Sequence, residues 1–240
     1  SADGASVTFK VTAPTDTALL DFDIAVSVGG SSITQSPKTM KLVDTPTTDS
    51  TLSCDTTTTG TEWIRADNTD SATCTITAKK LDGSNNVVAT RALIEDFNVV
   101  TTGTKSALQT SDDGATYTFT VTTSTVGTST VTAKISTNNI AGSPTLNAVA
   151  TVATTSTLAC IRDGSTAQQE YARYGGVVAC TITAKAADGS STKAFAGDFS
   201  VTLPDGGSIQ TALAASADGA SVTFKVTAPT DTALLDFDIA

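Results

Sequence analysis

The stretch "SDDGATYTFTV" (Ser111–Val121) decides the fold of this chain, because it joins a turn to a strand and then recurs. Asp113 and Gly114 supply the turn, since glycine accepts positive φ angles and aspartate bonds to nearby backbone N–H groups. Apolar residues then alternate with threonine, the pattern of a half-buried strand. The stretch returns 105 residues later as "SADGASVTFKV" (Ser216–Val226). The sequence therefore predicts a β domain that occurs more than once.

Other stretches repeat at nearly the same distance. "ATCTITAK" (Ala72–Lys79) returns as "VACTITAK" (Val178–Lys185) after 106 residues, and "EDFNV" (Glu95–Val99) returns as "GDFSV" (Gly197–Val201) after 102 residues. Offsets that drift by a few residues are typical of related domains with loops of different length. We infer a repeating domain of about 107 residues in two alternating versions, A and B.

A longer period contains this shorter one. Ser1–Ala25 is identical to Ser216–Ala240, 215 residues further on. The predicted organisation is the C-terminal part of a B domain (residues 1–48, "back of B"), a complete A domain (49–154, "A unit") and the N-terminal part of the next B domain (155–240, "front of B"). The second copy stops inside the strand pattern that the first copy continues, so we expect the polypeptide to extend past both ends as a repeat array. A two-domain piece of some other larger protein is the alternative.

The A unit has no sustained helical periodicity and reads as a series of short strands separated by turns rich in Gly, Asn and Asp. Seven short strands in about 105 residues predict an all-β fold of tandem seven-stranded immunoglobulin-like β-sandwich domains. The expected strands are Thr51–Cys54, Ala72–Lys79, Ile94–Val100, Ser106–Thr110, Thr116–Thr123, Ser129–Ser136 and Thr145–Ala150.

Four cysteines form two equally spaced pairs, Cys54 with Cys74 and Cys160 with Cys180. Each pair joins the first and second predicted strands of a domain, which are neighbours, so their Cα atoms can approach disulfide distance. The chain has no histidine, which argues against a zinc site. We predict two intradomain disulfides and an extracellular or cell-surface location. Buried free thiols in a cytosolic protein are the alternative.

The stretch from Ser111 to Pro144 resembles the end of a filamin-type immunoglobulin-like repeat, which closes with a D-G-x-Y strand and an I-x-G-S-P run. The matching residues are Asp113, Gly114, Tyr117, Gly127, Ile140, Gly142, Ser143 and Pro144. Domain B departs from it, with Val222 for the tyrosine and Gln35-Ser36-Pro37 for Gly-Ser-Pro. The resemblance implies a seven-strand sandwich in tandem arrays, used as a spacer or a protein-binding module, in an extracellular variety.

Charge and composition exclude several classes of function. The formal net charge is −10, which disfavours nucleic acid as a partner, and no long apolar run predicts membrane insertion. No histidine, base-assisted nucleophile or phosphate loop supports an enzyme or a cofactor site. Four aspartates lie near the predicted B-to-A junction: Asp21, Asp23, Asp44 and Asp49. They form either a solvent-exposed strand face or a set of oxygen ligands for Ca²⁺, and we favour the exposed face. We predict no metal.

Large aromatic residues are scarce, and three of them lie in the long loops between the paired cysteines: Trp63 in the A unit, and Tyr171 and Tyr174 in the front of B. They either anchor a contact between domains or chains, or cover one end of a sandwich. Val26 and Val28 belong to the segment Val26–Leu42. A neighbouring molecule that donates this segment would complete the front of B by strand addition.

The sequence therefore predicts a structural repeat segment of an extracellular filament or cell-surface appendage, whose partner is itself, as neighbouring repeats or identical chains. The alternative is a spacer stalk of an adhesin or receptor ectodomain whose recognition lies elsewhere.

Overall fold

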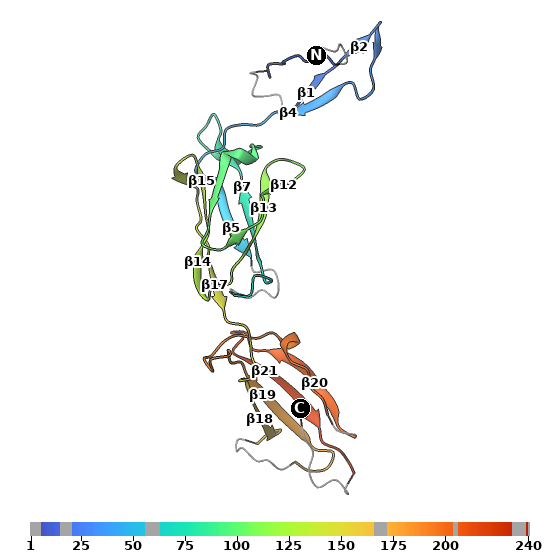
Figure 1. Ribbon diagram of the computed structural model, residues 1–240, viewed down its shortest axis with the longest axis vertical. Coiled ribbons are helices and arrows are strands. Elements are labelled where there is room, and N and C mark those ends of the chain that lie inside the picture. Colours follow the sequence, from blue (N-terminus) through green and yellow to red (C-terminus); the bar gives the residue numbers. More distant parts are fainter. Residues whose placement is uncertain are drawn as a thin grey trace.

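The fold is all-β, with strands gathered into three groups placed end to end (Figure 1). The back of B forms one group, the A unit the middle one, and the front of B the third. The boundaries between them stay predictions. The computed structural model of the chain describes residues 6–14, 21–55, 63–165, 172–203, 206–231 and 239.

The first sheet of the A unit is centred on β13 (Thr116–Thr122), the strand of the recurring stretch. Its order is β11-β13-β7-β5, with β12 also paired to β13. Every second residue of β7 is buried, and the alternate residues are all threonine, as expected for a sheet with one face toward solvent. The bounds of its other strands are β5 (Thr51–Asp55), β7 (Ala72–Thr77), β11 (Thr104–Lys105) and β12 (Gln109–Thr110).

Two smaller sheets form the second layer of the A unit. Their orders are β14-β17-β6 and β10-β15-β16. Ile76 and Phe119 of the first layer share one buried cluster with Val131 and Leu146 of the second, which is the arrangement of a sandwich. The strands are β6 (Trp63–Arg65), β10 (Phe97–Val100), β14 (Gly127–Thr130), β15 (Thr132–Ile135), β16 (Asn138–Asn139) and β17 (Thr145–Val149), with a separate hairpin of β8 (Lys79–Leu81) and β9 (Val87–Ala89).

The turn before β13 is held by side chains. Asp113 Oδ1 accepts the N–H of Ala115 at 2.9 Å, and Gly114 has a φ of 71°. Tyr117 is buried, and its hydroxyl donates to the carbonyl oxygens of Ala92 at 2.5 Å and Gly114 at 2.9 Å. Buried hydroxyl groups need such partners, so this tyrosine ties the turn to the neighbouring segment.

Several predicted strands differ from the structure in their extent, and three of them differ most. Residues 94–96 form a 3₁₀ turn, η1 (Ile94–Asp96), because the Asp96 side chain accepts the N–H of Leu93 at 2.8 Å. Within Ser106–Thr110, only the last two residues form a strand. Ser129–Ser136 is split at Val131, whose N–H donates to Pro144 at 2.9 Å, so β14 and β15 enter different sheets.

The front of B has one described sheet, of order β18-β19-β21-β20. Cys160 faces Cys180, which faces Phe224, just as Cys54 faces Cys74, which faces Phe119 in the A unit. The front of B therefore repeats the first layer of the A unit. Its elements are β18 (Thr157–Arg162), β19 (Val177–Thr183), η2 (Ala196–Asp198), β20 (Ser208–Ala215) and β21 (Ser221–Thr227).

The back of B repeats the second layer of the A unit. Phe22 pairs with Met40 as Ser129 pairs with Leu146, and the N–H of Ile33 donates to the Val26 carbonyl as that of Ile140 donates to the Ala133 carbonyl. The hairpin of β2 and β3 corresponds to the hairpin of β15 and β16. The four strands are β1 (Asp21–Ile24), β2 (Ser27–Val28), β3 (Ser31–Ser32) and β4 (Lys38–Lys41).

Candidate assembly site

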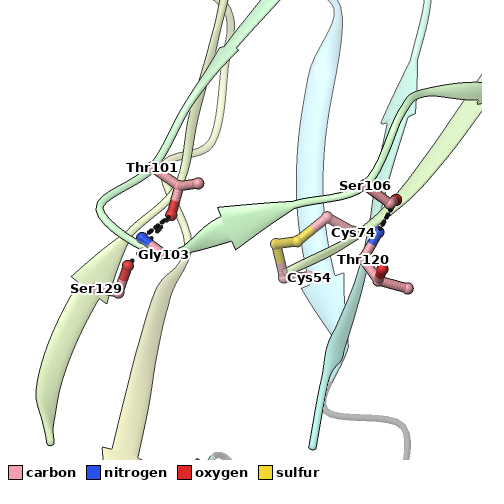
Figure 2. The surroundings of a disulfide bond; sticks show 7 residues. All are labelled: Cys54, Cys74, Thr101, Gly103, Ser106, Thr120 and Ser129. Atoms are coloured by element: carbon pink, nitrogen blue, oxygen red, sulfur yellow. Dashed lines mark hydrogen bonds between the residues drawn. A yellow bond between two sulfur atoms is a disulfide. The ribbon is translucent and has the colours of Figure 1, made fainter. Parts of the chain in front are cut away.

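Both cysteine pairs form disulfides across adjacent strands. Cys54 of β5 lies opposite Cys74 of β7, with 3.9 Å between their Cα atoms (Figure 2). Cys160 of β18 lies opposite Cys180 of β19, with 4.1 Å between their Cα atoms. The described residues include no free cysteine. Disulfides of this kind persist in oxidising compartments, which fits an extracellular location.

A compact contact joins the A unit to the front of B. The Trp63 ring stacks on the Phe195 ring, with 4.4 Å between centroids and 19° between planes. Gly219 lies beneath the indole, where a β-carbon would come within 3.0 Å of Trp63 Cζ2. A side chain at Gly219 would therefore push the tryptophan away, so the missing Cβ is part of the fit.

Arg65 closes the same contact. Its guanidinium lies over the Phe195 ring, 4.5 Å from the centroid, and one of its amino groups pairs with Asp198 Oδ1. Both partners of this ion pair are largely buried, so water screens them less than at an exposed surface. We call Trp63, Arg65, Phe195, Asp198 and Gly219 the junction lock.

The segment that connects the two domains is fixed by hydrogen bonds. Thr192 Oγ1 donates to the Ala150 carbonyl at 2.5 Å, and the N–H of Ala153 donates to the Lys185 carbonyl at 2.8 Å. Ser156 Oγ accepts the N–H of Lys185 at 3.1 Å. The connection leaves the A unit and enters the front of B with its backbone paired, which favours one relative orientation of the two domains.

The connection from the back of B into the A unit is built in the same way. The N–H of Thr47 donates to the Lys79 carbonyl at 2.8 Å, and Ser50 Oγ accepts the N–H of Lys79 at 3.0 Å. Asp44 accepts from Lys80 and from Thr90 Oγ1, the latter at 3.2 Å. The hydrogen bond from Lys80 is the main cause that lowers the pKa of Asp44 below its usual value.

The four aspartates considered as Ca²⁺ ligands have separate partners. Asp21 pairs with Arg91 at 2.8 Å, Asp23 accepts from Thr39 at 2.6 Å, and Asp49 accepts from Thr47 at 2.9 Å. Within the described residues, no group of three His, Cys, Asp or Glu side chains is placed to hold a metal ion. In the same part of the chain, no helix has the length and apolar character needed to cross a membrane.

The remaining predicted contact residues are placed as follows. Tyr171 lies outside the described residues. Tyr174 is exposed. Val26 is half-buried, with its N–H bonded to Ser36 Oγ at 2.7 Å, and Val28 has 73 % of its surface exposed. Trp63 begins strand β6 and does not lie in a loop as the sequence predicts, and the structure brings it into an interdomain contact.

A groove of about 420 Å³ opens on one face of the front-of-B sheet. Leu158 in this groove is 46 % exposed, whereas its counterpart Leu52 in the A unit is 5 % exposed. The second layer of the A unit covers Leu52, and no described second layer covers Leu158. The other apolar lining residues are Val152, Ala153, Ile182, Phe199, Val201, Phe224 and Ile239.

The sequence analysis did not single out Arg65, Phe195, Asp198 or Gly219. A signal for the arginine is present, because "EWIR" (Glu62–Arg65) returns as "EYAR" (Glu170–Arg173) after 108 residues. The aromatic residue and the arginine keep their spacing in both domains. No pattern in the sequence pairs this motif with Phe195, since that pairing depends on how two domains meet.

No protein-family model matches the chain, and no curated protein matches it. Among solved structures, it is similar to invasin, a bacterial integrin-binding protein, at 20 % identity and a TM-score of 0.38, over 85 % of this chain and 39 % of invasin. It is also similar to the Escherichia coli adhesin FdeC, at 16 % identity and a TM-score of 0.40, over 91 % of this chain and 72 % of that one. It is also similar to domains 5–6 of the S-layer protein SbsC, at 21 % identity and a TM-score of 0.26, over 80 % of this chain and 86 % of that one. The chain thus spans well under half of invasin, and its function is inferred below from its own residues.

Proposed function

We propose that this chain is a structural, non-catalytic repeat segment of an extracellular filament or cell-surface appendage that assembles with copies of itself. The observation that carries this proposal is the match between the groove on the front of B and the apolar strands of the back of B. The two segments correspond to the first and second layers of one sandwich, and the A unit contains both layers joined.

The A unit serves as the template for this match. Val131, Ala133, Ile140 and Leu146 of its second layer share a buried cluster with Leu52 and the rest of the first layer. Ile239, the counterpart of Ile24, already lines the groove of the front of B. At the remaining positions, the back of B carries apolar residues that are half-buried or exposed: Val26, Ile33 and Met40. Burying them against the groove of a front of B removes apolar surface on both sides from water, which is the main driving force for such docking.

The disulfides support an extracellular setting for this assembly. The filamin-type resemblance supports the same reading, as a tandem array of sandwiches. In an array, a front of B is completed by the back of B of the next repeat, and identical units make equivalent contacts.

Self-association of the 240-residue chain tests the proposal. Analytical ultracentrifugation should show oligomers whose size grows with concentration, because each chain offers one groove and one complementary set of strands. Met40→Asp should shift the chain toward the monomer, since it places a charge where an apolar side chain docks. Val126→Asp is the matched control, because Val126 is exposed on the A unit and has no part in the match.

A rearranged chain provides the complementary test. Residues 49–240 followed directly by residues 26–48 place both layers of B in one polypeptide, in the order of the proposed array. This chain should be monomeric and should unfold at a higher temperature than the original order. A monomeric original chain at all concentrations, or a rearranged chain that is no more stable, would contradict the match.

The spacer stalk of an adhesin or receptor ectodomain is the second candidate. The junction lock favours it, because a fixed orientation of successive domains suits a stalk that holds a binding domain away from a surface. In a stalk, all domains belong to one chain, so the complete protein should show recognition by a separate domain and no self-association.

A further inference from the structure

We propose that the junction lock recurs between copies of this chain, with Arg173 of a second copy paired to Asp96 at the far end of the A unit. This inference rests on the proposed self-association, which brings a second front of B to that end. It assigns an interaction surface to residues that make no such contact within one chain.

Arg173 carries the features of the arginine in the lock. It ends the "EYAR" motif (Glu170–Arg173), as Arg65 ends "EWIR" (Glu62–Arg65). The residue before it, Ala172, packs against the core of the front of B, as Ile64 packs in the core of the A unit. Arg173 is exposed, and no carboxylate in the described chain forms an ion pair with it.

Asp96 carries the features of the acceptor. Its Oδ2 atom receives the N–H of Leu93 at 2.8 Å, just as Asp198 Oδ2 receives the N–H of Phe195 at 2.7 Å. In the lock, the other oxygen of Asp198 binds the arginine. Among the described residues no cation pairs with Asp96, and Leu93, at the Phe195 position, is 45 % exposed.

The path of the strands delivers the arginine to this place. In the A unit, β6 runs parallel to β17, with Arg65 beside Val149. By the same pairing, Arg173 of a second copy lies beside Val43 once β4 occupies that copy's groove. Asp44 is the next residue after Val43, and its N–H donates to the Arg91 carbonyl at 3.0 Å. Arg91 is two residues before Leu93, so this hydrogen bond brings the segment close to the Leu93–Asp96 turn.

A second copy is required because the two halves of the contact lie far apart in one chain. Figure 1 places the front of B at one end of the A unit and the back of B at the other. The Leu93–Asp96 turn is at the end nearest the back of B, where Asp21 pairs with Arg91. Arg173 therefore cannot reach Asp96 of its own chain, and the contact joins molecules head to tail.

A double-mutant cycle tests this pair. Arg173→Glu, and separately Asp96→Asn, should each raise the concentration at which half of the chain is assembled by about tenfold, a usual effect for a partly buried interfacial ion pair. Asp96→Asn keeps an oxygen for the Leu93 N–H, so the turn remains closed. The double variant Arg173→Glu with Asp96→Asn should assemble no worse than either single variant, because both changes remove the same ion pair. Glu95→Arg is the control, because Glu95 is exposed and its counterpart in the front of B is Gly197.

Sedimentation of these variants separates the two proposals. Single variants that assemble as well as the wild type would overturn the Arg173–Asp96 pair and leave the groove-based assembly intact. Losses of assembly in the single variants that add up in the double variant would also overturn it, because residues of one ion pair cannot lose it twice. A wild-type chain that never assembles would overturn the proposed function and this contact with it.

Discussion

At the scale of single residues, a few hydrogen-bonded side chains set the local shape of each domain. Asp113 and Asp218 hold equivalent turns, each accepting a backbone N–H and a serine hydroxyl. These hydrogen bonds, first of all the one from serine, lower the pKa of each carboxyl below its usual value. The A unit adds Tyr117, whose place in domain B is taken by Val222, so only the A unit closes this turn with a buried hydroxyl.

Tyr117→Phe should lower the free energy of unfolding of the A unit by about 1–3 kcal/mol, because it leaves the carbonyl groups of Ala92 and Gly114 without their shared donor. Chemical denaturation followed by tryptophan fluorescence measures this loss. The denaturant dependence of the unfolding free energy should stay the same, since the ring remains in the core. A variant as stable as the wild type would show that water replaces the hydroxyl.

At the scale of elements, each disulfide joins two neighbouring strands of one sheet, and the register of these strands already places the cysteines opposite each other. Cys74 and Cys180 are buried, and each links a central strand to an edge strand. The edge strand is thereby held to the sheet at one fixed pair, which prevents a slip of register.

The double variant Cys54→Ser with Cys74→Ser should lower the free energy of unfolding by roughly 3 kcal/mol, the value expected for opening a loop of this length. Differential scanning calorimetry measures the change, and the same exchange at Cys160 and Cys180 provides a comparison. In protein purified without reductant, mass analysis should find each pair as a linked peptide. Four alkylatable thiols would contradict the disulfides and the extracellular setting together.

At the scale of the whole molecule, the junction lock and the paired connecting segment set the orientation of the A unit against the front of B. Trp63 belongs to the A unit, but it is absent from that unit's core cluster and contacts Phe195 of the next domain. Its burial therefore depends on the arrangement of two domains and not on the fold of one. A rod of such domains bends little if the contact recurs at each junction.

Trp63→Ala should loosen this arrangement while the A unit keeps its own fold. Small-angle X-ray scattering of the monomer, at low concentration, should show a wider distribution of shapes, because the stacking of Trp63 on Phe195 is lost. Trp63→Tyr is the control, since it keeps a ring and is the residue that the "EYAR" motif carries. Identical scattering from Trp63→Ala and the wild type would mean that the connecting hydrogen bonds suffice.

Sequence periodicity alone determined the β class and the cysteine partners, because these depend on alternation and spacing within short segments. It also predicts the two related domains. It also placed Trp63 and the back-of-B strands among candidate contacts. The extents of strands at Ile94–Asp96 and around Val131 were decided by tertiary structure, where one side-chain hydrogen bond or one change of sheet outweighs local propensity. The lock of Arg65 and Phe195 with Asp198, and the groove beside Leu158, were decided there too, since each depends on surfaces that residues far apart in the chain present to one another.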